Sequence, residues 1–163
     1  MTTSPTLSEG TPATAVPSRA SIAGHPLHPA VVPFPIALLS AALVTDLAAQ
    51  SSDDEFWPRA SRYLLGAGLA TGMTAGALGA VDYYGLERPR QVPEGRWHAL
   101  GNAIAMTLTA GNLALRRRCG RVPRSGLTLS AAVAGLLAVT GVLGGELSYR
   151  HLVGVDPKPE YRA

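Results

Sequence analysis

Four apolar stretches constrain this chain more than any other feature. They cover residues 30–49, 60–81, 97–115 and 126–147. Each has about the 20 residues that a helix needs to cross the roughly 30 Å of hydrocarbon in a bilayer. A soluble fold would have to enclose four such helices, and a chain of 163 residues holds too little other material for that. The sequence therefore predicts an all-α, polytopic membrane protein that forms a four-helix transmembrane bundle.

Charged and aromatic residues gather where these stretches end. Only 15% of the residues are charged, and most of them lie in the connections at 50–59, 82–96 and 116–125. Aromatic rings with a polar edge prefer the headgroup level of a bilayer. The rings near span ends belong to Trp57, Tyr63, Tyr83, Tyr84, Trp97 and Tyr149. This distribution favours membrane helices over a soluble core.

The chain divides into a membrane domain and two tails. Residues 1–24 are rich in Thr, Ser, Pro and Ala, and we predict a disordered tail there. They lack the basic start and apolar segment of a signal peptide, so we expect the first span to direct insertion. Residues 25–156 form the predicted transmembrane domain, and 157–163 form a C-terminal tail. The single cysteine, Cys119, excludes an intramolecular disulfide and a thiolate metal cluster.

Arginines between the third and fourth spans predict the orientation. The basic residues divide evenly between the two faces, but five arginines fall within residues 116–124: Arg116, Arg117, Arg118, Arg121 and Arg124. Dense basic loops stay in the cytoplasm, so we place this loop there and the opposite face outside the inner membrane. These arginines also suit anionic lipid, and we expect no nucleic-acid partner. Asp46, the acid farthest inside a span, is expected to reach the interface beside Arg59 or Arg62.

All the candidate ligands fall on one face if the chain threads in order. They are His25, His28, Asp82, His98, Glu146 and His151. His25 and His28 both precede a proline, which disfavours helical backbone, so both are expected in extended segments. Pro33 and Pro35 then remove two amide donors, which predicts a helix that is kinked or begins only after Pro35. Irregular backbone of this kind is typical of a cavity wall.

A polar stripe follows the third span. It consists of His98, Asn102, Ala105, Thr109 and Asn112, which recur at helical spacing. Residues at this spacing share one helix face, so we expect the stripe to face the interior of the bundle. Asn102 lies one turn from His98 and is expected to orient its ring.

Glycine patterns mark the second and fourth spans. Gly68, Gly72 and Gly76 recur every four residues, which is typical of close helix packing in membranes. Residues 78–84 also resemble residues 143–149. The resemblance predicts a duplicated helical hairpin, in which the histidines of both halves surround a common centre.

Several segments resemble one known family. Residues 24–38, Gly-His-Pro-Leu-His-Pro-Ala-Val-Val-Pro-Phe-Pro-Ile-Ala-Leu, are similar to the opening block of the bacterial predicted-membrane-protein family DUF2231. Asp82, the segment from Trp97 to Asn102, and residues 144–155 resemble its later blocks. The family has no established activity. Its members occur beside or fused to Rieske-type iron–sulfur domains, which implies membrane electron transfer with an iron–sulfur redox partner. One departure is Pro33, which stands where the family commonly has a histidine.

A haem protein is the first functional hypothesis. Haem b would be ligated by His25 or His28 from one side and His98 or His151 from the other. Imidazole on iron is the usual way in which a helical bundle holds haem without covalent attachment.

Two other hypotheses stand beside the haem. Three imidazoles, from His28, His98 and His151, with Asp82 or Glu146 would suit zinc, copper or ferrous iron. Alternatively, the protein is a membrane scaffold that binds no cofactor. We rank the redox role first and expect the three histidines to share a pocket near Asp82. Since no hydrolase or transferase motif is present, we predict no independent catalytic activity. The sequence leaves open whether the chain forms a homo-oligomer.

Overall fold

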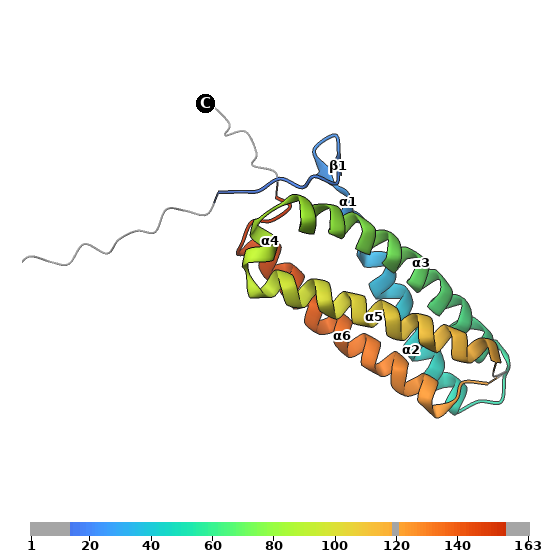
Figure 1. Cartoon of the computed structure of the whole chain (residues 1–163). Helices are drawn as coiled ribbons and strands as arrows, with labels where there is room; N and C mark the ends of the chain where they lie inside the picture. The colour runs from blue at the N-terminus through green and yellow to red at the C-terminus, as the bar shows by residue number, and fades with distance from the viewer. Residues whose placement is uncertain (1–13, 119–120, 156–163) are drawn as a thin grey trace, which may run out of the picture.

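Four long helices lie side by side and make up most of the molecule (Figure 1). The computed structural model describes residues 14–118 and 121–155. The elements in chain order are β1 (Ser21–Ile22), β2 (His25–Pro26), α1 (Leu27–Val31), α2 (Pro33–Gln50), α3 (Phe56–Gly85), α4 (Arg88–Gln91), α5 (Pro93–Arg118) and α6 (Arg124–Tyr149). Cys119 and the predicted C-terminal tail, residues 157–163, lie outside the described residues.

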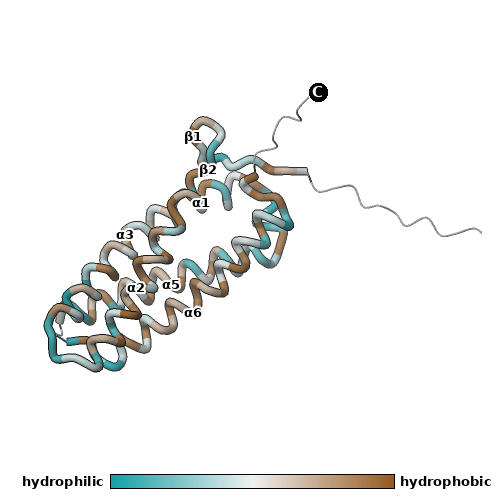
Figure 2. Tube along the Cα trace, turned by 180° about the vertical axis from the view of Figure 1, so that it is seen from behind, coloured by the Kyte–Doolittle hydropathy of each residue, from teal (hydrophilic) through white to brown (hydrophobic). Residues whose placement is uncertain are grey.

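Among the described residues, three helical segments are long and apolar enough to cross a membrane. They are Leu27–Gln50, Phe56–Gly85 and Arg124–Tyr149. The prediction of an apolar fourth span is not confirmed, although α5 is a long helix at the predicted place. Figure 2 shows that hydrophilic residues gather mostly at the two ends of the long helices. We call these the histidine end, beside α1 and α4, and the arginine end, beside the α2–α3 and α5–α6 connections (Figure 1).

The helices pack as two hairpins. Helix α2 pairs with α3, α5 pairs with α6, and the hairpins meet where α2 contacts α6 and α3 contacts α5. The core includes Leu39, Leu65, Ala105 and Val133, all nearly inaccessible to solvent. A Cβ atom on Gly68 would lie 2.5 Å from the Cδ2 atom of Leu39, so at this position the glycine permits close packing of α2 on α3.

The prolines of the first span do not delay the helix. His28 lies inside α1, so the prediction of extended backbone at this residue is wrong. Pro29 occupies the first turn of α1, where an amide has no intrahelical acceptor to lose. Val32 separates α1 from α2 but has helical angles (φ −51°, ψ −36°), and its amide bonds to the His28 carbonyl. The expectation of a start after Pro35 is also wrong, because the bonds that remain carry the helix past both prolines.

Part of the predicted disordered tail is ordered. Residues 14–24 run across the histidine end, and Val16 forms a bridge with Val153. The backbone amides of Arg19 and Ala20 donate to Asp82 Oδ1 at 2.7 and 3.2 Å. Residues 14–24 thus have a defined structure, because a carboxylate at the end of α3 supplies acceptors for this segment. Residues 1–13 lie outside the described residues.

A buried ion pair lies towards the arginine end. Asp46 is fully buried and Arg116 is 2% exposed, and two hydrogen bonds of 2.5 Å join the guanidinium to the carboxylate. Ser61, Asn112 and Ser130 complete the hydrogen bonding of this network, so all four long helices contribute to it. The expectation that Asp46 reaches the interface is wrong. Arg116 also cannot act as an exposed orientation signal, because the network holds it inside the bundle.

Candidate functional site

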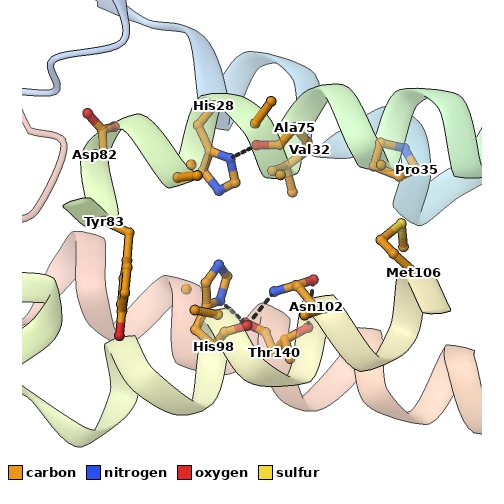
Figure 3. A pocket seen from close by; sticks show the side chains of 18 of the residues that line it. His28, Val32, Pro35, Ala75, Asp82, Tyr83, His98, Asn102, Met106 and Thr140 are labelled. Atoms are coloured by element: carbon orange, nitrogen blue, oxygen red, sulfur yellow. Dashed lines mark hydrogen bonds between the residues drawn. The ribbon is translucent and has the colours of Figure 1, made fainter. Parts of the chain in front are cut away.

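A cavity of about 960 Å³ lies between the two hairpins. It extends from Pro35 and Met106, part of the way along the helices, to Pro89 and Gly154 at the histidine end. Its lining is mostly apolar. Figure 3 shows one imidazole reaching into it from each of two opposite walls, those of His28 and His98.

The ring of His28 is held by the first hairpin alone. His28 belongs to α1, and its Nδ1 atom lies 2.8 Å from the carbonyl oxygen of Ala75 in α3. The ring packs on the next turn of α3, where a Cβ atom on Gly79 would lie 3.0 Å from the His28 Cε1 atom. The absence of a side chain at Gly79 therefore lets the imidazole pack closely against α3.

His98 repeats this arrangement in the second hairpin. Its Nδ1 atom lies 2.8 Å from the carbonyl oxygen of Thr140 in α6, and a Cβ atom on Gly144 would lie 3.0 Å from its Cε1 atom. In both hairpins the carbonyl comes four residues before the glycine. This equivalence supports the predicted duplication. Residue 75 is as far from residue 140, and residue 79 from residue 144, as segment 78–84 is from the similar segment 143–149.

The two rings leave one nitrogen each for a ligand. Their centroids are 6.2 Å apart and their planes are nearly perpendicular, at 83°. A carbonyl oxygen only accepts hydrogen bonds, so the Nδ1 atoms of His28 and His98 carry the hydrogens. Each neutral ring then has its lone pair on Nε2. The cavity thus holds two imidazole nitrogens that can ligate a metal, one from each of two opposite walls.

Small residues shape the cavity around the rings. They include Gly72, Gly76, Ala77, Ala80, Ala99 and Ala103. A Cβ atom on Gly76 or Gly141 would have no described atom within 4 Å. Helix packing explains Gly68, but it does not explain these two glycines, because no neighbouring helix approaches them. At these positions the absent side chains keep space open.

Asp82 is bonded to the N-terminal segment, and His151 lies beside Glu94. Asp82 lines the cavity, but its carboxylate accepts hydrogen bonds from Ser18 and from the backbone of residues 19 and 20. The Nε2 atom of His151 lies 3.4 Å from Glu94 Oε2, and neither atom has a hydrogen-bond partner among the described residues. His151 is not among the residues that line the cavity.

His25 and Glu146 also lie away from the two facing rings. His25 is exposed in β2, and its Nδ1 atom is 2.9 Å from the carbonyl oxygen of Ala23. Glu146 pairs with Arg150 at 3.6 Å. Within residues 14–118 and 121–155, no three His, Cys, Asp or Glu side chains are grouped closely enough to hold a metal ion. The structure therefore brings together His28 and His98, with Asp82 at the same cavity, and leaves the other candidates apart.

Asn102 does not have the predicted role. The polar stripe of α5 does face the bundle interior, since Thr109 and Asn112 are fully buried. However, the Asn102 amide donates to the carbonyl oxygen of His98, and the Thr140 carbonyl holds the ring. Sequence reasoning missed both backbone acceptors, although the glycine one turn beyond each of them was a usable signal.

Pro33 lies outside the site. It is exposed and is not among the residues that line the cavity. The departure from the family at this position therefore leaves the pair formed by His28 and His98 intact.

The comparisons with known proteins place the whole helical region in one family. A family model described as "Predicted membrane protein (DUF2231)" matches residues 24–157. No curated protein and no solved structure matches the chain. The matched region begins just before His25 and includes both cavity histidines, both glycines against their rings and all four long helices. The chain thus belongs to the DUF2231 family of predicted membrane proteins.

Proposed function

We propose that this protein is an electron-transfer subunit of the membrane that holds one b-type haem, and that His28 and His98 would ligate its iron. The observation that carries the proposal is the pair of facing imidazoles, whose centroids are 6.2 Å apart. A metal lies about 2.0 Å from a ligating imidazole nitrogen, so two rings on opposite sides of one ion have centroids roughly 6 Å apart. The spacing of this pair suits one ion between the rings.

The surroundings of the rings also suit a haem. The cavity of about 960 Å³ is at the upper end of the range of roughly 300–1,000 Å³ for ligand sites, and its walls are apolar. The Ala75 and Thr140 carbonyls fix the tautomer and increase the basicity of each ring. Haem would supply one-electron redox chemistry, and this chain would ligate it, orient it and exclude water from it.

We further propose that α5 crosses the bilayer with the other three long helices. Its polar residues Asn102, Thr109 and Asn112 lie within the bundle, so they lower the mean hydropathy of α5 without meeting lipid. The proposed location is the inner membrane, with the arginine end in the cytoplasm. The histidine end would then meet the redox partner, for which an iron–sulfur protein is our proposal.

The test is an absorption spectrum of detergent-purified protein from haem-replete cells, before and after reduction. We expect a Soret band that shifts on reduction, with one haem per chain. His28→Ala and His98→Ala should each abolish this spectrum. His25→Ala and His151→Ala remove imidazoles at the same end of the bundle, outside the cavity, and should leave the spectrum unchanged.

Three outcomes would contradict this proposal. Stoichiometric zinc, copper or iron without a Soret band would assign a bare metal site. Colourless, metal-free protein from cells replete in both haem and metals would favour the scaffold without a cofactor. A spectrum that survives in His98→Ala and is lost in His151→Ala would mean that a haem ligand lies outside the described cavity.

A further inference from the structure

A second, smaller cavity opens at the arginine end. Its volume is about 220 Å³, and the residues that line it include Glu55, Pro58, Arg59, Arg62, Arg116 and Arg121. In contrast to the cavity at the histidine end, most of the surface that it exposes is polar. Four guanidinium groups and one carboxylate thus meet around a small hollow.

The positive charge of this cavity comes from three of the four arginines. Arg116 is neutralised by Asp46, and its guanidinium hydrogens are taken up by the buried network. Arg59 lies 3.5 Å from Glu55, and both of these side chains are mostly exposed. Arg62 has no carboxylate within 4.0 Å among the described residues.

Arg121 adds a third cation from the other hairpin. It pairs with Asp53 at 2.8 Å, but both side chains are more than four-fifths exposed, and exposed pairs are held only weakly. Three cations therefore face the cavity, and only Arg59 and Arg121 have exposed carboxylate partners, Glu55 and Asp53. This excess of positive charge favours an anion as the occupant.

We propose that this cavity binds the phosphate group of an anionic phospholipid. Guanidinium groups bind phosphate through paired, charge-assisted hydrogen bonds, and Arg59, Arg62 and Arg121 offer three of them. The cavity lies where α3 begins, which is the headgroup level if α3 spans the bilayer. A lipid bound there would hold the two hairpins together at the end opposite the histidines. The proposal does not depend on a haem.

The test uses Trp57, which directly precedes the cavity residue Pro58. In a Trp97→Phe background, Trp57 is the only tryptophan. The purified full chain in detergent is titrated with brominated phosphatidylglycerol or brominated phosphatidylcholine. We expect half-maximal quenching of Trp57 at a roughly tenfold lower mole fraction of phosphatidylglycerol, since basic side chains at a membrane surface attract anionic headgroups.

The double variant Arg59→Gln/Arg62→Gln should lose this preference. Arg117→Gln is the matched control, because Arg117 is exposed at the same end but does not line the cavity. Equal losses in the double variant and the control, or equal quenching by both lipids in the unchanged protein, would overturn the proposal. Competition by millimolar inorganic phosphate would show that the site takes free phosphate rather than lipid. Lack of competition would mean that the site binds the phosphate of the lipid headgroup.

Discussion

A glycine lies against each histidine of the cavity. Gly79 and Gly144 face the rings of His28 and His98, and a Cβ atom at either position would come within 3.0 Å of an imidazole carbon. At this distance the ring has to shift by a few tenths of an ångström, which strains its hydrogen bond to the carbonyl one turn away. The glycines therefore position the histidines rather than the helices.

Gly144→Ala tests this role of the glycine. We expect the added methyl group to displace the His98 ring and to weaken haem retention by about tenfold, while the helical content stays the same. The displacement is local because only ring atoms lie within 4 Å of the new carbon. Titration of the purified apoprotein with haemin measures the change. Gly135→Ala on the same helix has no described atom within 4 Å and should bind like the unchanged protein. Equal affinity for both variants would contradict the positioning role.

The sequence pointed to His28 and His98, which line one cavity, but it did not predict the contacts of their rings. The spacing of the stripe placed His98 on the inner face of α5, and the family block pointed to His28. The partners of the rings are the carbonyl oxygens of Ala75 and Thr140, and every residue has such an oxygen. The sequence instead points to Asn102, because its side chain is polar and one turn away from His98. The only sequence signal of these backbone acceptors is the glycine one turn beyond each of them, at which the ring packs.

At the level of elements, Asp82 connects the N-terminal segment to α3. Its carboxylate accepts hydrogen bonds from Ser18, Arg19 and Ala20, which lie more than 60 residues away in the chain. Asp82→Asn removes the charge and turns one oxygen into a donor. We expect the amides of residues 19 and 20 to exchange their hydrogens at least tenfold faster, since bonds to charged groups contribute about 1.5–3 kcal/mol each. Hydrogen exchange followed by mass spectrometry measures this.

Glu87→Gln serves as the control for Asp82→Asn. Glu87 is an exposed acid beside the same end of α3, and no ion pair or side-chain hydrogen bond involves it among the described residues. Its removal should leave the exchange of residues 19 and 20 unchanged. If Asp82→Asn gave the same slow exchange, the segment would be held by Val16 and Val153 instead.

The ion pair of Asp46 and Arg116 joins α2 to α5. Asp46→Ala would leave a buried guanidinium without its carboxylate, so we expect it to lower the free energy of unfolding by about 3–5 kcal/mol. Asp53→Ala breaks the exposed pair with Arg121 and should cost less than about 1 kcal/mol. Titration of both variants with dodecyl sulfate in mixed micelles measures the difference. Equal effects would mean that the buried network contributes no more than a surface pair.

At the scale of the whole molecule, periodicity and length predicted the helices, but burial could not be derived from them. Each of the four predicted stretches became a long helix, and the structure extended α3 and α5 beyond the predicted ends. The sequence predicts a loop position for Arg116, because five arginines lie close together there. Its true position depends on Asp46, which is 70 residues away, and no local pattern reports such a pairing. For the same reason, the mean hydropathy of α5 does not reveal that Thr109 and Asn112 are buried inside the bundle.

The arrangement of the helices predicts where the ends of the bundle lie in the membrane. If α5 crosses the bilayer with the other three, the α2–α3 and α5–α6 connections share one side, and the N-terminal segment lies on the other. Ser52, Ser125 and Ser21 are exposed at these three places, so each can carry a single cysteine in a Cys119→Ser background. An impermeant maleimide should label Ser52→Cys and Ser125→Cys in inside-out vesicles and Ser21→Cys in right-side-out vesicles. Labelling of Ser52→Cys and Ser125→Cys from opposite sides would mean that α5 does not span. Reversal of all three would keep the bundle but place the arginine end outside, because the dense arginines would then have failed to retain their loop in the cytoplasm.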